Sequence, residues 1–250
     1  MTLRLGIVLP TYNERGNLRG MVERLDAALA GIGWEVIVVD DNSPDGTADE
    51  ARALGREDSR VRVIQRIGRR GLSSAAIEGM CATAAPVVAV MDADHQHDPA
   101  LLPDMLAAIE SGDYDLSYAS RFAEGASTEA WGRPDRVKAS GIANKIANKV
   151  TGVELTDPMS GYFMLRSEVL RADAHRLSGV GFKILLDLVV TATRRGTRPA
   201  IAEVPYTFRP RHAGESKMSP IVVLQFAGLW VSKLSGSVLP TSFLLFSLVG

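Results

Sequence analysis

The first half of the chain alternates between short apolar runs and amphipathic stretches. Four apolar runs end in polar or turn-forming residues, and they cover residues 5–9, 35–39, 61–64 and 86–91. Apolar residues at helical spacing lie between Leu18 and Leu29, and small residues fill the stretch from Gly71 to Ala84. Nearly continuous apolar strands separated by helices predict a parallel α/β sheet that helices cover on both faces.

The second half is more mixed in character. Three further runs predict strands over residues 115–120, 162–165 and 201–208, with helices over residues 143–150 and 184–190. The polar, glycine-containing stretch from residue 123 to residue 135 is expected to form a mobile loop. With 250 residues and no internal repeat, the chain is long enough for one good core, and we expect a single main domain over residues 1–217.

The C-terminal end differs from the rest of the chain. Residues 218–237 are amphipathic, with Trp230 and Lys233 close to an uncharged apolar tail over residues 238–250. This combination is typical of a helix that lies at a membrane interface. We therefore expect a juxtamembrane amphipathic helix over 218–237 and the start of a transmembrane segment over 238–250. The alternative for the tail is a buried helix of the core.

The composition excludes some classes of protein. Hydrophobic residues make up 46% of the chain and charged residues 23%, as in globular rather than disordered proteins. The formal net charge of -1 gives no basis for nucleic acid as the main partner. Cys81 is the only cysteine, so no intrachain disulfide forms and a reducing compartment is favoured. The small and apolar neighbours of Cys81 predict a buried thiol without a chemical role.

The most informative polar feature is the pair Asp92 and Asp94, directly after the fourth apolar run. Two carboxylates at a strand end, with Gln96 as a third oxygen ligand, suit Mg²⁺ or Mn²⁺ that also binds diphosphate oxygens. Such a metal neutralises charge on a leaving diphosphate. His95 and His97 offer a zinc alternative, but the surrounding carboxylates favour an oxygen site, and the bland interpretation is two surface histidines.

Phosphatases with an aspartyl nucleophile also carry two aspartates after a strand. They need the pair at the end of the first core strand and a lysine later in the fold. Here the first run ends in the segment Pro10–Glu14, so this class of enzyme is disfavoured.

The other strand ends carry candidate nucleotide ligands. Asp40–Asp41 ends the second run and offers hydrogen bonds to a ribose or a base, as in other open α/β sheets. The alternative is a helix-capping turn, which Asp45 and Thr47 support. Tyr12 and Glu14 follow the first run, where a ring face and a carboxylate suit a base.

Two groups of basic residues are candidates for phosphate recognition. Arg66, Arg69 and Arg70 precede the small-residue helix, and Arg211 and Lys217 flank a turn just before the amphipathic segment. A guanidinium group can donate two parallel hydrogen bonds to the oxygens of one phosphate. A lipid phosphate would reach Arg211 and Lys217 from the expected membrane. The usual alternative for such charge runs is a solvated face.

Several stretches together resemble one known family. They are Leu9–Glu14, Val38–Thr47, Met91–His97, Asp157–Phe163, Gly181–Leu186 and Arg211–Lys217. In these segments the chain resembles the family 2 glycosyltransferases, and among them the polyprenyl-phosphate (dolichol-phosphate) mannosyltransferases. The matches span nearly the whole chain in order.

The resemblance implies a Rossmann-like GT-A domain over 1–217, a nucleoside diphosphate sugar, a divalent cation (Mg²⁺ or Mn²⁺) and inverting transfer to a lipid phosphate. By position it implies these nucleotide-sugar contacts: Pro10, Tyr12, Glu14, Val39, Asp41, Asp92, Ala93, Asp94, Gln96, Lys183, Arg211 and Lys217. Metal ligands would be Asp92, Asp94 and Gln96, catalytic residues Asp94, Arg211 and Lys217, and Arg121 a lipid-phosphate contact. One departure is His95, where the family usually has Leu, which puts the packing of the loop in doubt.

The leading hypothesis is transfer of mannose from GDP-mannose to a polyprenyl monophosphate by a membrane-associated enzyme whose catalytic domain is cytoplasmic. A lipid monophosphate is already an anion, so no strong general base is needed. UDP-glucose is the alternative donor. Transfer to a soluble or polysaccharide hydroxyl is a second reading and would need a base, with Asp157 as first candidate. An inactive sugar-nucleotide-binding scaffold subunit is the rival from another class.

Overall fold

The computed structural model describes residues 1–123, 148, 152, 154–181 and 183–206. Its strands are β1 (Leu5–Thr11), β2 (Trp34–Asp40), β3 (Val61–Gln65), β4 (Val87–Val90), β5 (Leu116–Ser120), β6 (Phe163–Arg166) and β7 (Ile201–Pro205). Its α-helices are α1 (Arg15–Ala28), α2 (Thr47–Glu57), α3 (Leu72–Cys81), α4 (Leu102–Glu110), α6 (Ser167–Asp173) and α7 (Ile184–Arg194). Two 3₁₀ turns are η1 (Pro99–Leu101) and η3 (Ala174–Arg176).

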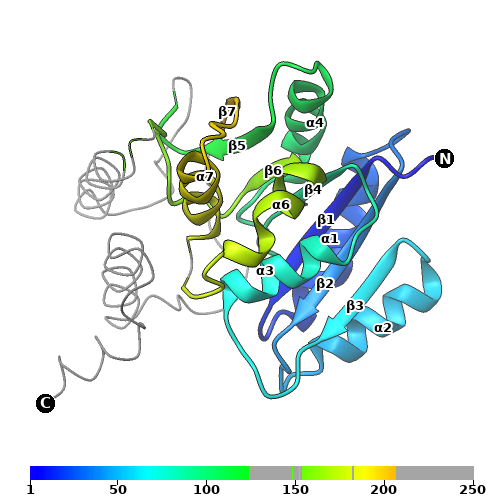
Figure 1. The fold of residues 1–250 in the computed structure, drawn as a ribbon. Helices are drawn as coiled ribbons and strands as arrows, with labels where there is room; N and C mark the ends of the chain where they lie inside the picture. The colour runs from blue at the N-terminus through cyan, green and yellow to red at the C-terminus, as the bar shows by residue number, and fades with distance from the viewer. Residues whose placement is uncertain (124–147, 149–151, 153, 182, 207–250) are drawn as a thin grey trace, which may run out of the picture.

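The seven strands form one sheet with the order β3-β2-β1-β4-β6-β5-β7 (Figure 1). The first four are parallel, so their carboxyl ends meet at one edge. β6 runs antiparallel to both of its neighbours, and β7 pairs in parallel with β5. The antiparallel β6 therefore brings its N-terminal end to the edge where β1, β2 and β4 end.

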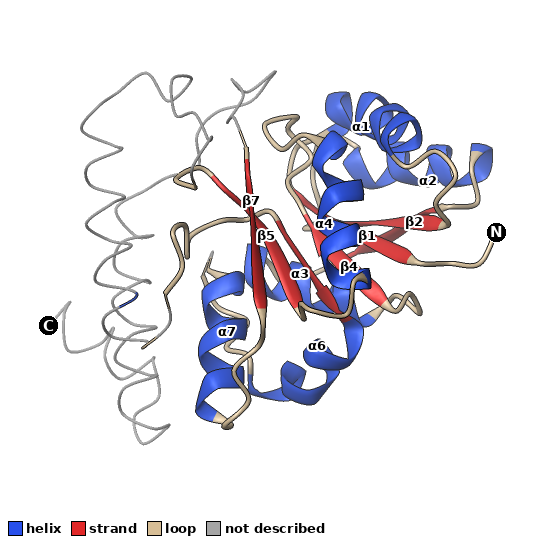
Figure 2. Ribbon diagram, turned by 90° about the horizontal axis from the view of Figure 1, so that it is seen from above, coloured by secondary structure: helices blue, strands red, loops and turns tan. Residues whose placement is uncertain are grey.

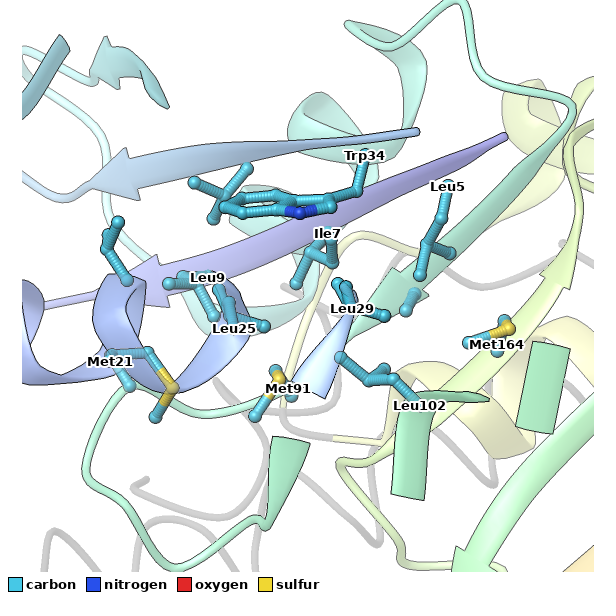
Figure 3. Packing of buried hydrophobic residues seen from close by; sticks show 14 of the residues in the cluster. Leu5, Ile7, Leu9, Met21, Leu25, Leu29, Trp34, Met91, Leu102 and Met164 are labelled. Atoms are coloured by element: carbon cyan, nitrogen blue, oxygen red, sulfur yellow. The ribbon is translucent and has the colours of Figure 1, made fainter. Parts of the chain in front are cut away.

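Helices cover the sheet on both faces, as the apolar runs predict (Figure 2). On β1, Leu5, Ile7 and Leu9 pack into the cluster that contains side chains of α1, α2 and α4. Val8 points the other way, into the cluster with α3, α6 and α7. This alternation is the period of two that a strand imposes on its side chains. Figure 3 shows the first cluster, where Leu25, Leu29 and Trp34 lie close to the β1 side chains.

α3 approaches the sheet closely because it contains Gly79. A Cβ atom built on Gly79 would lie 2.3 Å from a methyl group of Val8 and 2.8 Å from one of Val39. Such distances are far below a van der Waals contact, so the helix could not keep this position with a larger residue. The small residues that predict a helix here therefore also set its distance from β1 and β2.

The seven expected strands are confirmed, with ends that differ by one or two residues, apart from residues 207 and 208 of the last one, which the structure does not describe. Two helices, α4 and α6, were not expected from the sequence. The expectation of a buried Cys81 was wrong, because this residue is exposed. Apart from residues 123 and 148, the loop expected over 123–135, the helix over 143–150, the amphipathic helix over 218–237 and the tail over 238–250 lie outside the described residues.

Within the described residues, no helix is long and apolar enough to cross a membrane.

Candidate functional site

The site begins where β4 ends. Val90 pairs with Val8 of β1 and with Phe163 of β6, and the Met91 N–H still donates to the Val8 carbonyl at 3.1 Å. The chain then leaves the sheet at Asp92, at the edge where β1 and β2 also end. Ligands of open α/β sheets bind beyond this edge.

Residues 92–97, called the carboxylate turn below, close on themselves through two hydrogen bonds. The Gln96 N–H donates to Oδ1 of Asp94 at 3.1 Å, and the Asp92 N–H donates to Nδ1 of His97 at 2.9 Å. The Asp94 side chain is nearly buried, whereas 41% of the Asp92 side chain is exposed. The structure thus brings two predicted metal carboxylates to one short turn, one fixed and one open to solvent.

His97 is buried, with 4% of its surface exposed, so the interpretation as a surface histidine was wrong. Its ring stacks on Tyr162 with centroids 5.0 Å apart, and Tyr206 approaches it edge-on at 6.1 Å. Burial lowers the pKa of His97 to about 4, against a weaker opposing effect of the Asp94 charge. The imidazole is therefore neutral at physiological pH, and its 3.8 Å contact with Asp92 is not an ion pair.

His95 points away from the site toward α1. Its backbone adopts a left-handed conformation, with φ of 64°, and Arg24 contacts its Nδ1 at 3.1 Å. Arg24 also donates to Asp98 at 2.9 Å. A Cβ atom on Gly20 would lie 3.5 Å from the His95 ring, so the missing side chain of this glycine leaves room for the ring beside α1. His95, the residue that departs from the family pattern, therefore packs against α1.

The donor set of the carboxylate turn fits a magnesium-type ion. Among the described residues, no three His, Cys, Asp or Glu side chains are grouped so that they could hold a metal. Such a group is what zinc would require, whereas Mg²⁺ is usually held by one or two carboxylates together with water and substrate phosphates. Asp92 and Asp94 match the second case, with carboxylate oxygens and one solvent-exposed side chain.

A second group of charged residues, called the charge cluster below, consists of Arg121, Asp157 and Lys183. Arg121 follows β5 and makes a two-pronged ion pair with Asp157, with nitrogen–oxygen distances of 2.7 and 2.8 Å. Asp157 is fully buried. Burial alone would lower the pKa of Arg121, but the hydrogen bonds to Asp157 and its charge raise it overall. Arg121 is therefore a fixed positive charge.

Lys183 directly precedes α7 and is the second cation of the charge cluster. Burial and repulsion from the Arg121 charge lower the pKa of Lys183 to about 8, although Asp157 acts in the opposite direction. The charge of Lys183 therefore interacts with both Arg121 and Asp157. An anionic ligand would relieve that repulsion.

Tyr206 lies between the carboxylate turn and the charge cluster. Burial raises the pKa of Tyr206, and the charges of Arg121, Asp157, Asp92 and Asp94 all act on its hydroxyl. The two groups therefore belong to one site, although they come from segments far apart in the chain. Neither Tyr162 nor Tyr206 was singled out from the sequence, although Tyr162 lies within the segment Asp157–Phe163 that carries the family resemblance.

The predicted nucleoside residues lie at the ends of β1 and β2. Pro10 and Val39 are buried within paired strands, opposite one another. Glu14 accepts a hydrogen bond from Asn17 at 2.6 Å, and the Arg70 guanidinium lies 4.6 Å from the centre of the Tyr12 ring. These contacts hold the first strand end in place. Its role in nucleoside binding stays a prediction.

Two roles were considered for Asp40 and Asp41, a contact with a nucleoside and a turn before the next helix, and the contacts of the two residues differ. Asp40 is buried and accepts hydrogen bonds from the backbone and hydroxyl groups of Ser43, so it closes the turn after β2. Asp41 accepts a hydrogen bond from the Gly71 N–H at 2.7 Å and lies 3.1 Å from Arg66. Asp41 therefore ties the end of β2 to the loop before α3, and its contact with a nucleoside stays a prediction.

The first basic group is held by carboxylates rather than open to a phosphate. Arg66 is buried beside Asp41 and Glu78, and Arg69 pairs with Glu78 at 2.7 Å. Arg69 and Arg70 are both exposed, and Arg70 lies over the Tyr12 ring. The second basic group, Arg211 and Lys217, lies outside the described residues.

Comparison with known proteins identifies the family and agrees with the fold. The model of glycosyl transferase family 2 matches residues 6–173. Solved structures of glucosyl-3-phosphoglycerate synthase from Mycobacterium tuberculosis have the same fold: a complex with UDP superposes with a TM-score of 0.64 at 22% identity, covering 92% of this chain and 79% of that one. A complex with Mn²⁺, UDP and product gives 0.62 at 22% identity, with 95% and 81% covered.

The fold is that of a GT-A-like glycosyltransferase, and the chain belongs to glycosyl transferase family 2. Among curated relatives, the dolichol-phosphate mannosyltransferase of Pyrococcus furiosus is 37% identical over 90% of this chain, which spans 62% of the relative's length. That of Saccharomyces cerevisiae is 35% identical, with 90% and 85% covered. The undecaprenyl-phosphate mannosyltransferase of Micrococcus luteus is 37% identical, with 88% and 90% covered.

Proposed function

We propose that this protein transfers mannose from GDP-mannose to a polyprenyl monophosphate, with inversion at the sugar and with a divalent cation. The proposal rests on the charge cluster: Arg121 forms an ion pair with the buried Asp157, and the Lys183 charge interacts with both, close to the carboxylate turn. Relatives whose names include dolichol-phosphate and undecaprenyl-phosphate mannosyltransferase support the sugar and the acceptor class.

The charge cluster favours a phosphate over a hydroxyl as the acceptor. The second pKa of a phosphate monoester is about 6, so a lipid monophosphate is already an anion at neutral pH and needs no strong base. A hydroxyl acceptor would need a general base, and Asp157 was the candidate. Both oxygens of Asp157 accept hydrogen bonds from Arg121, and the side chain is fully buried. Asp157 is therefore a partner of Arg121 rather than a base.

Asp92 and Asp94 would hold the cation, with Gln96 as a further ligand. When bound, the cation would neutralise charge on the departing diphosphate. Lys183 and Arg121 would hold the acceptor phosphate against the sugar, and Arg211 and Lys217 would contact both phosphates. Tyr12, Glu14 and Asp41 would bind the nucleoside at the ends of β1 and β2. A lipid acceptor also implies membrane association, with the domain on the cytoplasmic side and residues 218–250 at the membrane.

In the decisive experiment, the purified protein is incubated with radiolabelled GDP-mannose or UDP-glucose, a short polyprenyl phosphate and Mn²⁺. The mixture is then extracted with organic solvent. Label in the lipid phase with GDP-mannose alone is the expected result. Label from UDP-glucose alone would replace mannose by glucose. Label that stays in water with a new sugar product would favour a hydroxyl acceptor. No transfer from either donor, together with retained nucleotide binding, would favour a scaffold subunit and overturn the proposal.

A further inference from the structure

His97 is a buried residue of the carboxylate turn to which the proposed chemistry gives no task. It lies within the turn that carries both predicted metal carboxylates, yet it is buried and stacked on Tyr162. A buried histidine can be a simple core residue. A hydrogen bond distinguishes His97 from a simple core residue: its Nδ1 accepts the backbone N–H of Asp92 at 2.9 Å.

The Asp92 N–H needs such an acceptor because the sheet provides none at this position. The last ladder bond of this strand is the one from the Met91 N–H to the Val8 carbonyl. Asp92 is the next residue, and a buried or half-buried N–H without an acceptor destabilises the fold. The His97 ring supplies the acceptor from inside the turn. It thereby fixes the backbone from which the Asp92 side chain projects.

The ring itself is held in place from several sides. Tyr162 stacks against one face, and Tyr206 packs edge-on. The Tyr162 hydroxyl donates to the Asp98 carbonyl at 2.9 Å, just beyond the turn. Gly161 adds a close approach: a Cβ atom there would lie 3.6 Å from the His97 ring and 3.9 Å from a carboxylate oxygen of Asp92. The acceptor atom therefore has little freedom to move.

We propose that His97 is a positioning residue that orients the Asp92 carboxylate toward the divalent cation through the hydrogen bond from the Asp92 N–H. This inference rests on the cation site of the proposed function. Groups that orient metal ligands without touching the metal typically change metal affinity by about 10- to 100-fold when they are removed. His97 thus acts on the metal through Asp92 and is not itself a ligand.

Two substitutions separate the acceptor from the ring. His97→Phe keeps an aromatic ring against Tyr162 but removes the acceptor. His97→Asn loses the ring but keeps an oxygen near the position of Nδ1. We expect His97→Phe to weaken Mn²⁺ binding by about 10- to 100-fold and His97→Asn to recover most of that loss. Binding is measured by isothermal titration of Mn²⁺ into the protein with GDP, so the readout does not depend on transfer.

The control is His175→Asn, because His175 lies on the exposed η3 turn. It should bind Mn²⁺ as the wild type does. A simple core role for His97 predicts a different pattern: a lower melting temperature in both His97 variants with unchanged Mn²⁺ affinity in their folded fractions. That pattern would overturn the inference, as would equal weakening by Phe and Asn.

If His97→Phe does not fold, His97→Leu replaces it, since it removes the acceptor with less volume. The two proposals fail in different ways. A wild-type protein that binds Mn²⁺ with GDP but transfers no mannose overturns the proposed function and leaves the His97 comparison decisive. Unchanged Mn²⁺ binding in a folded variant without the acceptor overturns the inference alone. A wild type that binds no Mn²⁺ overturns both.

Discussion

The carboxylate turn and the charge cluster lie in the same site, but different interactions hold them. The turn is local: six consecutive residues close through hydrogen bonds to backbone N–H groups, and its neutral histidine packs between tyrosines. The charge cluster joins residues 121, 157 and 183 through charge, with a buried two-pronged ion pair and a lysine of lowered pKa. The carboxylate turn, the proposed metal side, is therefore expected to be sensitive to changes in geometry. The charge cluster, the proposed acceptor side, is expected to be sensitive to changes in ionisation.

The largest effect is expected on the metal side. Asp94→Asn keeps an oxygen that accepts the Gln96 N–H, so the turn should still close, but it removes one negative ligand. We expect mannosyl transfer to fall on the order of 100- to 1000-fold, comparable to the loss of one electrostatic stabiliser of a transition state. The matched control is Asp104→Asn on the exposed face of α4. Full activity of Asp94→Asn with an unchanged Mn²⁺ requirement would mean that the metal site lies elsewhere.

The charge cluster should respond in stability as well as activity. Arg121→Met leaves the fully buried Asp157 without its partner, and breaking a buried ion pair costs about 3–5 kcal/mol of unfolding free energy. Replacing both partners, as in Arg121→Met with Asp157→Leu, should recover most of that stability but no transfer. Denaturant unfolding and the lipid-extraction assay check the two halves. A double variant that regains activity would show that the pair serves only the fold.

The ionisation of Lys183 gives the acceptor side a pH dependence. Since its pKa is lowered from 10.5 to about 8, the free protein loses this positive charge as the pH rises through 8. The value of kcat/KM for the acceptor should then fall, approaching about tenfold per pH unit well above 8. In Lys183→Arg the guanidinium stays charged, so the fall should move to higher pH. An identical pH profile in Lys183→Arg would assign the titration to another group.

The smallest effect is expected for His95, which lies in the turn but faces α1. Its contact with Arg24 is partly exposed, and such interactions contribute at most about 1 kcal/mol. His95→Leu should therefore leave transfer and Mn²⁺ affinity within about threefold of the wild type. The same titration used for the His97 variants measures this. A loss as large as that expected for His97→Phe would show that the outer contact with α1 also positions the carboxylates.

The sequence allowed the parallel part of the sheet to be predicted because each strand is a continuous apolar run with a turn after it. α4 was missed although Asp98 and Pro99 mark the start of the helical segment, with the Asp98 side chain accepting from the backbone N–H of Ala100. The antiparallel direction of β6 could not be predicted, because a short apolar run is the same in either direction and only pairing with β4 and β5 fixes it. Cys81 was misjudged because its neighbours are small and apolar while its own side chain faces solvent.

The sequence by itself determined the local part of this site: two carboxylates two residues apart after a buried strand, which the pleat and the following turn bring to one edge. It could not show that His97 is an internal acceptor, since its ring is held by Tyr162, just before β6, and Tyr206, just after β7. Nor could the sequence show that Arg121 pairs with Asp157 or that the pKa of Lys183 is lowered. These properties arise from burial and from distances between segments far apart in the chain, which only the tertiary structure decides.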